Sequence, residues 1–201
     1  MYVPAAFAGT DAQAREMIDA YPFATVIGNG AGGMVAAHLP LLRDGDTLLG
    51  HLAGPNPLTD LQFDAAKTGT EVLAIFHAPH FYVSPTWYQA KSGTVPTWNY
   101  GAVHVYGVPR PTDDKAKLHD LVARLAARYE KGDWRFENQP PIFVDKMLGG
   151  IAGFEIPMTR VETKLKLSQN RARADRDGVL AAIDGENAEF MRRYGLPEKQ
   201  Q

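Results

Sequence analysis

The chemically most suggestive stretch of the chain is VPTWNYGAVHVYG, residues 95–107, which mixes aromatic, amide and imidazole side chains. With the two-residue repeat of a β-strand, Trp98 and His104 point to one side while Asn99 and Gly101 point to the other. The second side is narrow because Gly101 has no side chain, so a flat group could approach the backbone there. The pattern predicts either a site for a planar ligand or a strand that the protein itself packs.

A second polar cluster lies in KLKLSQNRAR, residues 164–173. Its cations and amides suit a phosphate group or the edge of a pyrimidine-like ring, because lysine and arginine bind oxyanions while amides both donate and accept hydrogen bonds. The alternative is the solvent-exposed end of a β-hairpin. The residue types alone leave both interpretations open.

The histidines offer a third candidate chemistry. His77 and His80 are three residues apart, a spacing that places them on opposite faces of a regular strand unless the chain bends at Pro79. No carboxylate cluster accompanies them, so we predict no metal site. His51 and His104 lie in other predicted strands, where a hydrogen-bonded core histidine is more common than a functional one.

Composition excludes several classes of function. The chain of 201 residues has no cysteine, which removes disulfides, thiolate catalysis and zinc–thiolate sites. The formal charge of −2 gives no general attraction for nucleic acid or anionic lipid. No serine lies in a G-x-S-x-G elbow, and no apolar run approaches the roughly 20 residues of a membrane helix. We therefore expect a soluble cytoplasmic protein.

Hydrophobic alternation predicts the strands that must position these groups. Six or seven strands are expected, in the segments 23–30, 33–42, 47–54, 71–84, 95–107, 151–157 and 159–168. The last two are predicted to form a hairpin. The segment GNGAGG, residues 28–33, leads into a strand, so it is a hairpin loop and not a dinucleotide-binding fingerprint.

Helices are predicted at the margins of these strands and between them. A capping box at Thr10 and Gln13 begins the first helix, and Asn56 followed by proline begins a short one. Three further helical regions follow: 113–131, 140–150 and the tail from about 175. The sum is an α+β fold, an antiparallel β-barrel with peripheral helices, in a single domain over 1–201 with a helical tail over about 175–201.

Five segments carry a resemblance to a known family: AAHLPLL, GHLAGPNP, VLAIFHAPHFYVSPTWY, VPTWNYGAVHVYG and KLKLSQNRA. Their order and spacing resemble the PaiB-type proteins, a family described as FMN-binding negative transcriptional regulators. The likeness runs from Met1 to about Arg193. It implies a flavin-binding split β-barrel, a homodimer with the flavin near the subunit interface, and kinship with pyridoxamine-phosphate-oxidase-like and haem-handling proteins.

The resemblance also implies a set of residues that line the cofactor or substrate site. They share ring, amide or cationic chemistry and lie in the resembling motifs: His51, Asn56, Trp87, Trp98, Asn99, His104, Lys166, Gln169 and Asn170. After GH, where relatives carry a basic or aromatic residue, this chain has Leu52, Ala53 and Gly54, which argues against a phosphate contact at that loop. No catalytic residue is assigned.

Three functions follow from the resemblance. The first is an FMN-binding regulator or flavin-linked sensor. The alternatives are a flavin-dependent oxidoreductase with a nicotinamide or small organic substrate, and a haem-binding protein on the same barrel. Direct DNA contact would need a local patch on a dimer, because neither the overall charge nor a helix-turn-helix pattern supports it. We expect the narrow side of strand 95–107 to face the flavin, with Trp98 and Tyr100 packed against the neighbouring subunit or the barrel end.

Overall fold

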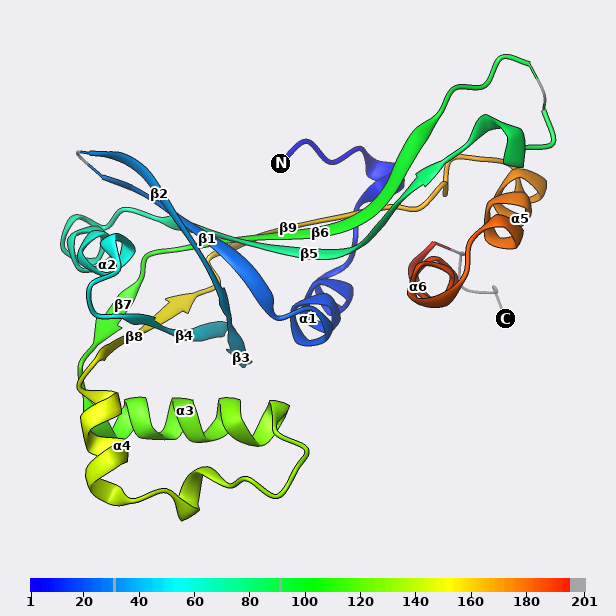
Figure 1. Cartoon of the computed structure of the whole chain (residues 1–201). Helices are drawn as coiled ribbons and strands as arrows, with labels where there is room; N and C mark the ends of the chain where they lie inside the picture. Colours follow the sequence, from blue (N-terminus) through cyan, green and yellow to red (C-terminus); the bar gives the residue numbers. More distant parts are fainter. Residues whose placement is uncertain (31, 91, 196–201) are drawn as a thin grey trace. The chain divides into compact units, whose positions relative to one another are not determined.

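The strands of the protein lie in two sheets (Figure 1). The computed structural model describes residues 1–30, 32–90 and 92–195. The five-stranded sheet has the order β2-β1-β5-β6-β9 and consists of β1 (Phe23–Gly30), β2 (Gly33–Pro40), β5 (Val72–Val83), β6 (Thr97–Gly107) and β9 (Arg160–Lys166). The four-stranded sheet has the order β3-β4-β8-β7 and consists of β3 (Leu42–Asp44), β4 (Thr47–Ala53), β7 (Arg110–Thr112) and β8 (Ile151–Pro157).

All seven predicted strand segments are strands, and the short strands β3 and β7 were not predicted. Three residues are too few to show alternation, so the sequence carries no signal for them. The pairs β1–β2, β3–β4, β4–β8 and β7–β8 are antiparallel. In the β1–β2 hairpin Gly30 lies opposite Gly33, which confirms the hairpin loop predicted at GNGAGG; Ala31 lies outside the described residues.

The prediction that residues 151–157 and 159–168 form a hairpin is wrong, because β8 and β9 belong to different sheets. The link between them explains the difference. The Met158 backbone N–H donates to the Asp46 carbonyl at 2.8 Å, and the Thr159 N–H donates to the Tyr106 carbonyl at 3.0 Å. These bonds hold the two linking residues against the turn between β3 and β4 and against β6, so the chain passes from one sheet to the other without forming a hairpin.

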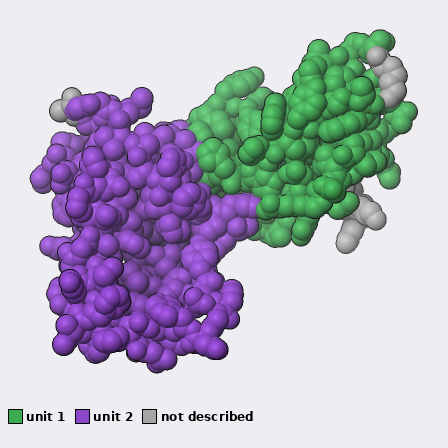
Figure 2. All heavy atoms as spheres, in the orientation of Figure 1, with its two compact units in different colours: residues 1–17, 76–104, 162–201 green, residues 18–75, 105–161 purple. Residues whose placement is uncertain are grey.

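The chain divides into two compact units, each assembled from separate segments (Figure 2). Unit 1 comprises residues 1–17, 76–104 and 162–201, and unit 2 comprises residues 18–75 and 105–161. Strands β5 and β6 contribute residues to both units. The single domain over 1–201 stays a prediction. Residues 196–201 of the predicted helical tail lie outside the described residues.

The predicted helical regions are all helical. The α-helices in the described part of the chain are α1 (Asp11–Ala20), α2 (Pro57–Thr68), α3 (Lys115–Tyr129), α4 (Pro141–Leu148), α5 (Arg173–Ala182) and α6 (Gly185–Tyr194). Reciprocal hydrogen bonds between Thr10 and Gln13 form the predicted capping box, at 2.9 and 3.2 Å. Among the described residues, none of these helices combines the length and apolar character needed to cross a bilayer.

In unit 1, helices fill the narrow side of β6. A Cβ atom placed on Gly101 would lie 2.5 Å from Phe190 Cζ, 2.9 Å from Met17 Cε and 3.0 Å from Ala78 Cβ. Phe190 belongs to α6 and Met17 to α1, and both side chains are buried. The expectation that this side of β6 leaves room for a flavin is therefore wrong, because the protein's own side chains occupy the space.

Substitution of Gly101 tests this packing. We expect Gly101→Ala to lower the free energy of unfolding by about 1–3 kcal/mol, because the added methyl group must displace two buried side chains. Urea unfolding of the purified protein measures the change. Gly32→Ala is the matched control, since nothing lies within 4 Å of a Cβ at that position. Equal stability of the two variants would contradict the close packing at Gly101.

Candidate functional site

Unit 1 exposes a cluster of rings that we call the aromatic face: His80 and Tyr82 of β5, Trp87 of the short 3-10 helix Pro85–Trp87, and Trp98 of β6. The ring centroids of Tyr82 and Trp98 are 6.4 Å apart and those of His80 and Trp98 are 5.8 Å apart. The Tyr82 and Trp87 rings meet edge to face at 6.5 Å. Trp98 is 53% exposed and Tyr82 is 46% exposed, so flat apolar surface remains uncovered.

A shift in the alternation of β5 places its side chains on this face. Ala78 and Phe81 are three residues apart and both are buried, so the alternation of β5 shifts by one residue at Pro79–His80. His77, His80 and Tyr82 are consequently all exposed. The two histidines do not lie on opposite sides as a regular strand would have them. The described residues contain no group of three or more His, Asp or Glu side chains that could hold a metal ion.

Trp87 is held in place by α5. The Trp87 carbonyl oxygen would lie 2.1 Å from a Cβ on Gly178, so only glycine lets the helix approach this closely. The buried carboxylate of Asp175 accepts a hydrogen bond from the Gln89 backbone N–H at 2.9 Å. These contacts fix the turn that follows β5, and with it one end of the aromatic face.

Lys166 places a half-buried amine against the backbone of the aromatic face. Its Nζ donates to the Trp98 carbonyl at 2.5 Å and to the Thr97 hydroxyl. Burial lowers the pKa of the Lys166 ammonium, and the nearby charges of Lys164 and Arg171 lower it further. An anion bound beside Lys166 would stabilise the ammonium form, because its negative charge offsets the free-energy cost of burying the positive charge.

Two more cations of unit 1 lie over aromatic rings. The Arg171 guanidinium is 4.6 Å from the centroid of the Tyr88 ring, and Lys164 Nζ is 5.5 Å from the centroid of Tyr100. Together with Lys166 they make this part of unit 1 positive. Ring surface and positive charge are the two features that a flat, phosphate-bearing ligand requires.

Two of the predicted amides have structural roles instead of facing a ligand. Asn99 is buried, and its side chain exchanges hydrogen bonds with the Ser168 hydroxyl at 3.0 and 3.3 Å. Ser168 has a left-handed backbone with φ 66°, a conformation that costs free energy unless its surroundings hold it. Gln169 accepts from the Leu167 N–H at 2.7 Å and donates to the Leu165 carbonyl at 2.5 Å. Both amides thus stabilise the turn after β9.

In unit 2, the side chain of Asn56 is likewise occupied. Its Oδ1 accepts a hydrogen bond from the Leu58 N–H at 2.9 Å and so caps α2, which confirms the predicted helix start. The helix runs for 12 residues and is longer than expected.

His51 of β4 is the other predicted site residue in unit 2. Its buried Nδ1 has no hydrogen-bond partner among the described residues, and burial lowers the pKa of its imidazole. An unpartnered buried nitrogen costs free energy, so His51 remains a candidate for contact with a ligand.

The remaining predicted residues are His104 and Asn170, both in unit 1. His104 is half-buried, and burial is the main cause that lowers the pKa of its imidazole. Asn170 is exposed in the turn after β9. The structure therefore brings the predicted residues Trp87, Trp98 and Lys166 together in unit 1. The amides of Asn56, Asn99 and Gln169 instead make hydrogen bonds within the protein. His80 and Tyr82 join the site although the sequence analysis did not predict them. The signal for those two was Pro79, because proline inside a strand often marks a bulge.

The lowered pKa of His51 gives a prediction about stability. Well above pH 6.5 the imidazole is neutral in both the folded and the unfolded chain; as the pH falls through about 6.5, the unfolded chain takes up a proton first. The free energy of unfolding should therefore fall as the pH is lowered through about 6.5. Urea unfolding of the wild type and of His51→Gln measures this loss, which we expect to be smaller in the variant. An identical loss in both proteins would contradict burial of a neutral His51.

Comparison with known proteins finds a matching family model and a similar protein. A family model described as "Putative FMN-binding domain" matches residues 1–160. The chain is 32% identical over 194 residues to the Protease synthase and sporulation protein PAI 2 of Bacillus subtilis, covering 92% of this chain and 90% of the relative.

Two solved structures have a similar fold. The flavocytochrome Anf3 from Azotobacter vinelandii matches with a TM-score of 0.63 and 17% identity, over 78% of this chain and 67% of that one. The FAD and heme binding protein from Mycobacterium smegmatis matches with a TM-score of 0.56 and 20% identity, over 88% and 79%. The predicted fold class, an α+β split β-barrel with peripheral helices, is confirmed.

Proposed function

The chain belongs to the FMN-binding domain family, and we propose that it binds FMN with the flavin ring against the aromatic face of unit 1. The observation that carries this proposal is the half-exposed pair Trp98 and Tyr82, whose rings meet at 6.4 Å beside the amine of Lys166. A tricyclic ring that covered the exposed part of Trp98 would remove on the order of 100 Å² of apolar surface from water, worth about 2.5 kcal/mol.

The residues of unit 1 fit the two ends of this cofactor differently. The rings of Trp98, Tyr82 and His80 offer flat surfaces to the isoalloxazine, which would supply the redox chemistry when bound. Lys166 and Arg171 offer positive charge to the phosphate, and that phosphate would offset the cost that lowers the pKa of Lys166. Asn99 and Gln169 do not fit the role of ring contacts, because their amides already bond within the protein.

The biological role that we propose is a regulator or sensor that responds to its flavin, acting as a homodimer. The name of the Bacillus relative, which refers to sporulation, supports a regulatory role. The exposed apolar side chains of unit 1, which include Tyr2, Val95, Tyr82 and Trp98, support a dimer, since a partner subunit would remove them from water.

Titration of the purified protein with FMN tests the site. We expect saturable binding, with quenching of flavin and tryptophan fluorescence, and a loss of about tenfold to a hundredfold in affinity for Trp98→Ala, since stacking on one aromatic ring contributes about 1–3 kcal/mol. Trp134→Ala is the matched control, because Trp134 is a similarly exposed tryptophan in unit 2. Equal losses in both variants, or a protein that ignores FMN, would contradict the proposal.

A second measurement separates a sensor from an oxidoreductase. The FMN-loaded protein is mixed with NADH or NADPH without oxygen, and the visible flavin absorbance is followed. We expect reduction far slower than about 1 per second, the low end of common enzyme turnover. Rapid bleaching by either nucleotide would show an oxidoreductase instead, while leaving FMN binding itself intact.

A further inference from the structure

Unit 2 contains a cleft of about 480 Å³ that the proposed flavin site does not use. It lies between α3 and the strands β4 and β8, and its volume falls in the range of small-molecule sites. All of the residues that line it belong to unit 2. The cleft therefore shares no residue with the proposed flavin site of unit 1.

The floor of the cleft is apolar. Leu118 and Leu121 of α3 lie across from Leu49 of β4 and Phe154 of β8. Leu49 is only partly buried where it packs against the core cluster that includes Leu121. Apolar surface therefore remains open to the cleft and can bind the hydrocarbon part of a ligand.

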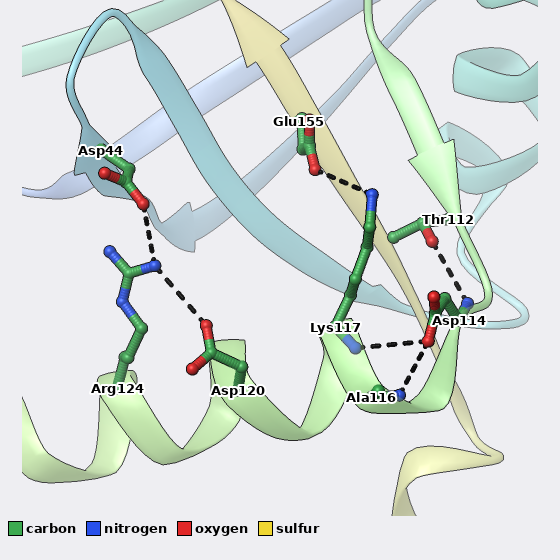
Figure 3. A network of polar contacts seen from close by, with 8 residues as sticks. All are labelled: Asp44, Thr112, Asp114, Ala116, Lys117, Asp120, Arg124 and Glu155. Atoms are coloured by element: carbon green, nitrogen blue, oxygen red, sulfur yellow. Dashed lines mark hydrogen bonds and ion pairs between the residues drawn. The ribbon is translucent and has the colours of Figure 1, made fainter.

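The first turn of α3 is fixed to the sheet, so the cleft has a defined wall (Figure 3). Asp114 caps the helix by accepting from the Ala116 N–H at 2.9 Å. The Asp114 N–H in turn donates to the Thr112 hydroxyl of β7 at 3.2 Å. Helix and strand are therefore joined both by the chain and by hydrogen bonds at this end.

Two ion pairs cross the cleft from α3 to the sheet (Figure 3). Lys117 Nζ lies 3.4 Å from Glu155 Oε1 at one end. At the other end Arg124 Nη1 lies 3.0 Å from Asp44 Oδ2 and 3.6 Å from Asp120 Oδ2. One guanidinium thus faces two carboxylates, and the lining as a whole carries one more negative charge than positive.

The carboxylates also stand further out than the cation between them. The side chains of Asp44 and Asp120 are 59% and 68% exposed, whereas that of Arg124 is 38% exposed. Each carboxylate has a second oxygen that the ion pair with Arg124 does not use. A ligand that enters from solvent at this end therefore meets acceptor oxygens and negative charge first.

From this arrangement we propose that the α3 cleft binds a small organic cation, an amine with an apolar body. Its ammonium group donates to the outer oxygens of Asp44 and Asp120, and its hydrocarbon part lies on Leu49 and Leu121. A carboxylate of the same size would meet the excess negative charge instead, so the site distinguishes the two by charge.

The test uses two probes of matched size, 2-phenylethylamine and 3-phenylpropanoate, with the leucine methyl groups of the full chain observed by NMR. We expect the amine to cause saturable shifts at the methyls of Leu49, Leu118 and Leu121. The carboxylate should bind at least about fivefold more weakly, the ratio that one favourable exposed ion pair provides. No shifts with the amine, shifts confined to unit 1, or equal binding of both probes would overturn the proposal.

Asp120→Asn tests the contact itself. Because Asp120 is mostly exposed, the variant should fold normally and bind the amine about fivefold more weakly. Asp64→Asn is the matched control, since Asp64 forms an exposed ion pair with Lys67 at 3.3 Å on α2 of the same unit. If both variants lost affinity equally, the attraction would be a general effect of charge and the assigned site would be wrong. Parallel titrations with FMN separate the outcome from that of the flavin site.

Discussion

The packing of Phe190 and Met17 against Gly101 decides which side of β6 can meet a ligand. These two buried side chains come within 2.5 and 2.9 Å of the position of a Cβ on Gly101, so the narrow side of the strand is closed. The aromatic side is therefore where we propose that unit 1 binds its ligand. Trp98 projects there, supported by His80 and Tyr82, while Lys166 donates to the Trp98 carbonyl from the neighbouring strand.

Local patterns predicted the elements well because the physics that forms them is local. The capping box at Thr10, the cap at Asn56 and the alternation within β6 involve residues a few positions apart. The side chains that fill the narrow side of β6 could not be predicted from local patterns, because Phe190 of α6 is distant from Gly101 in the sequence. The wrong hairpin has a similar cause, since Met158 and Thr159 bond to residues distant in sequence.

The candidate site was predicted in part for the same reason. Trp87, Trp98 and Lys166 were chosen by chemistry and do come together, but amides of suitable chemistry also serve the fold. Asn99 holds the turn at Ser168, and Asn56 caps a helix, so both side chains already make hydrogen bonds within the protein. His80 and Tyr82 were not predicted because the alternation of β5 shifts at Pro79, which changes the side chains that are exposed. The α3 cleft depends on the distance between a helix and a sheet, which no pattern in the sequence specifies.

The most direct test of the flavin site is to ask which side chains touch the bound ring. Intermolecular NOEs between the methyl protons of the FMN ring and the protein report only direct contacts, and successive side chains of a strand point to opposite faces, so the NOEs distinguish the two sides of β6. The account predicts NOEs to the ring protons of Trp98 and Tyr82. NOEs to the Met17 methyl or the Phe190 ring, without any to Trp98, would place the flavin on the closed side and contradict it.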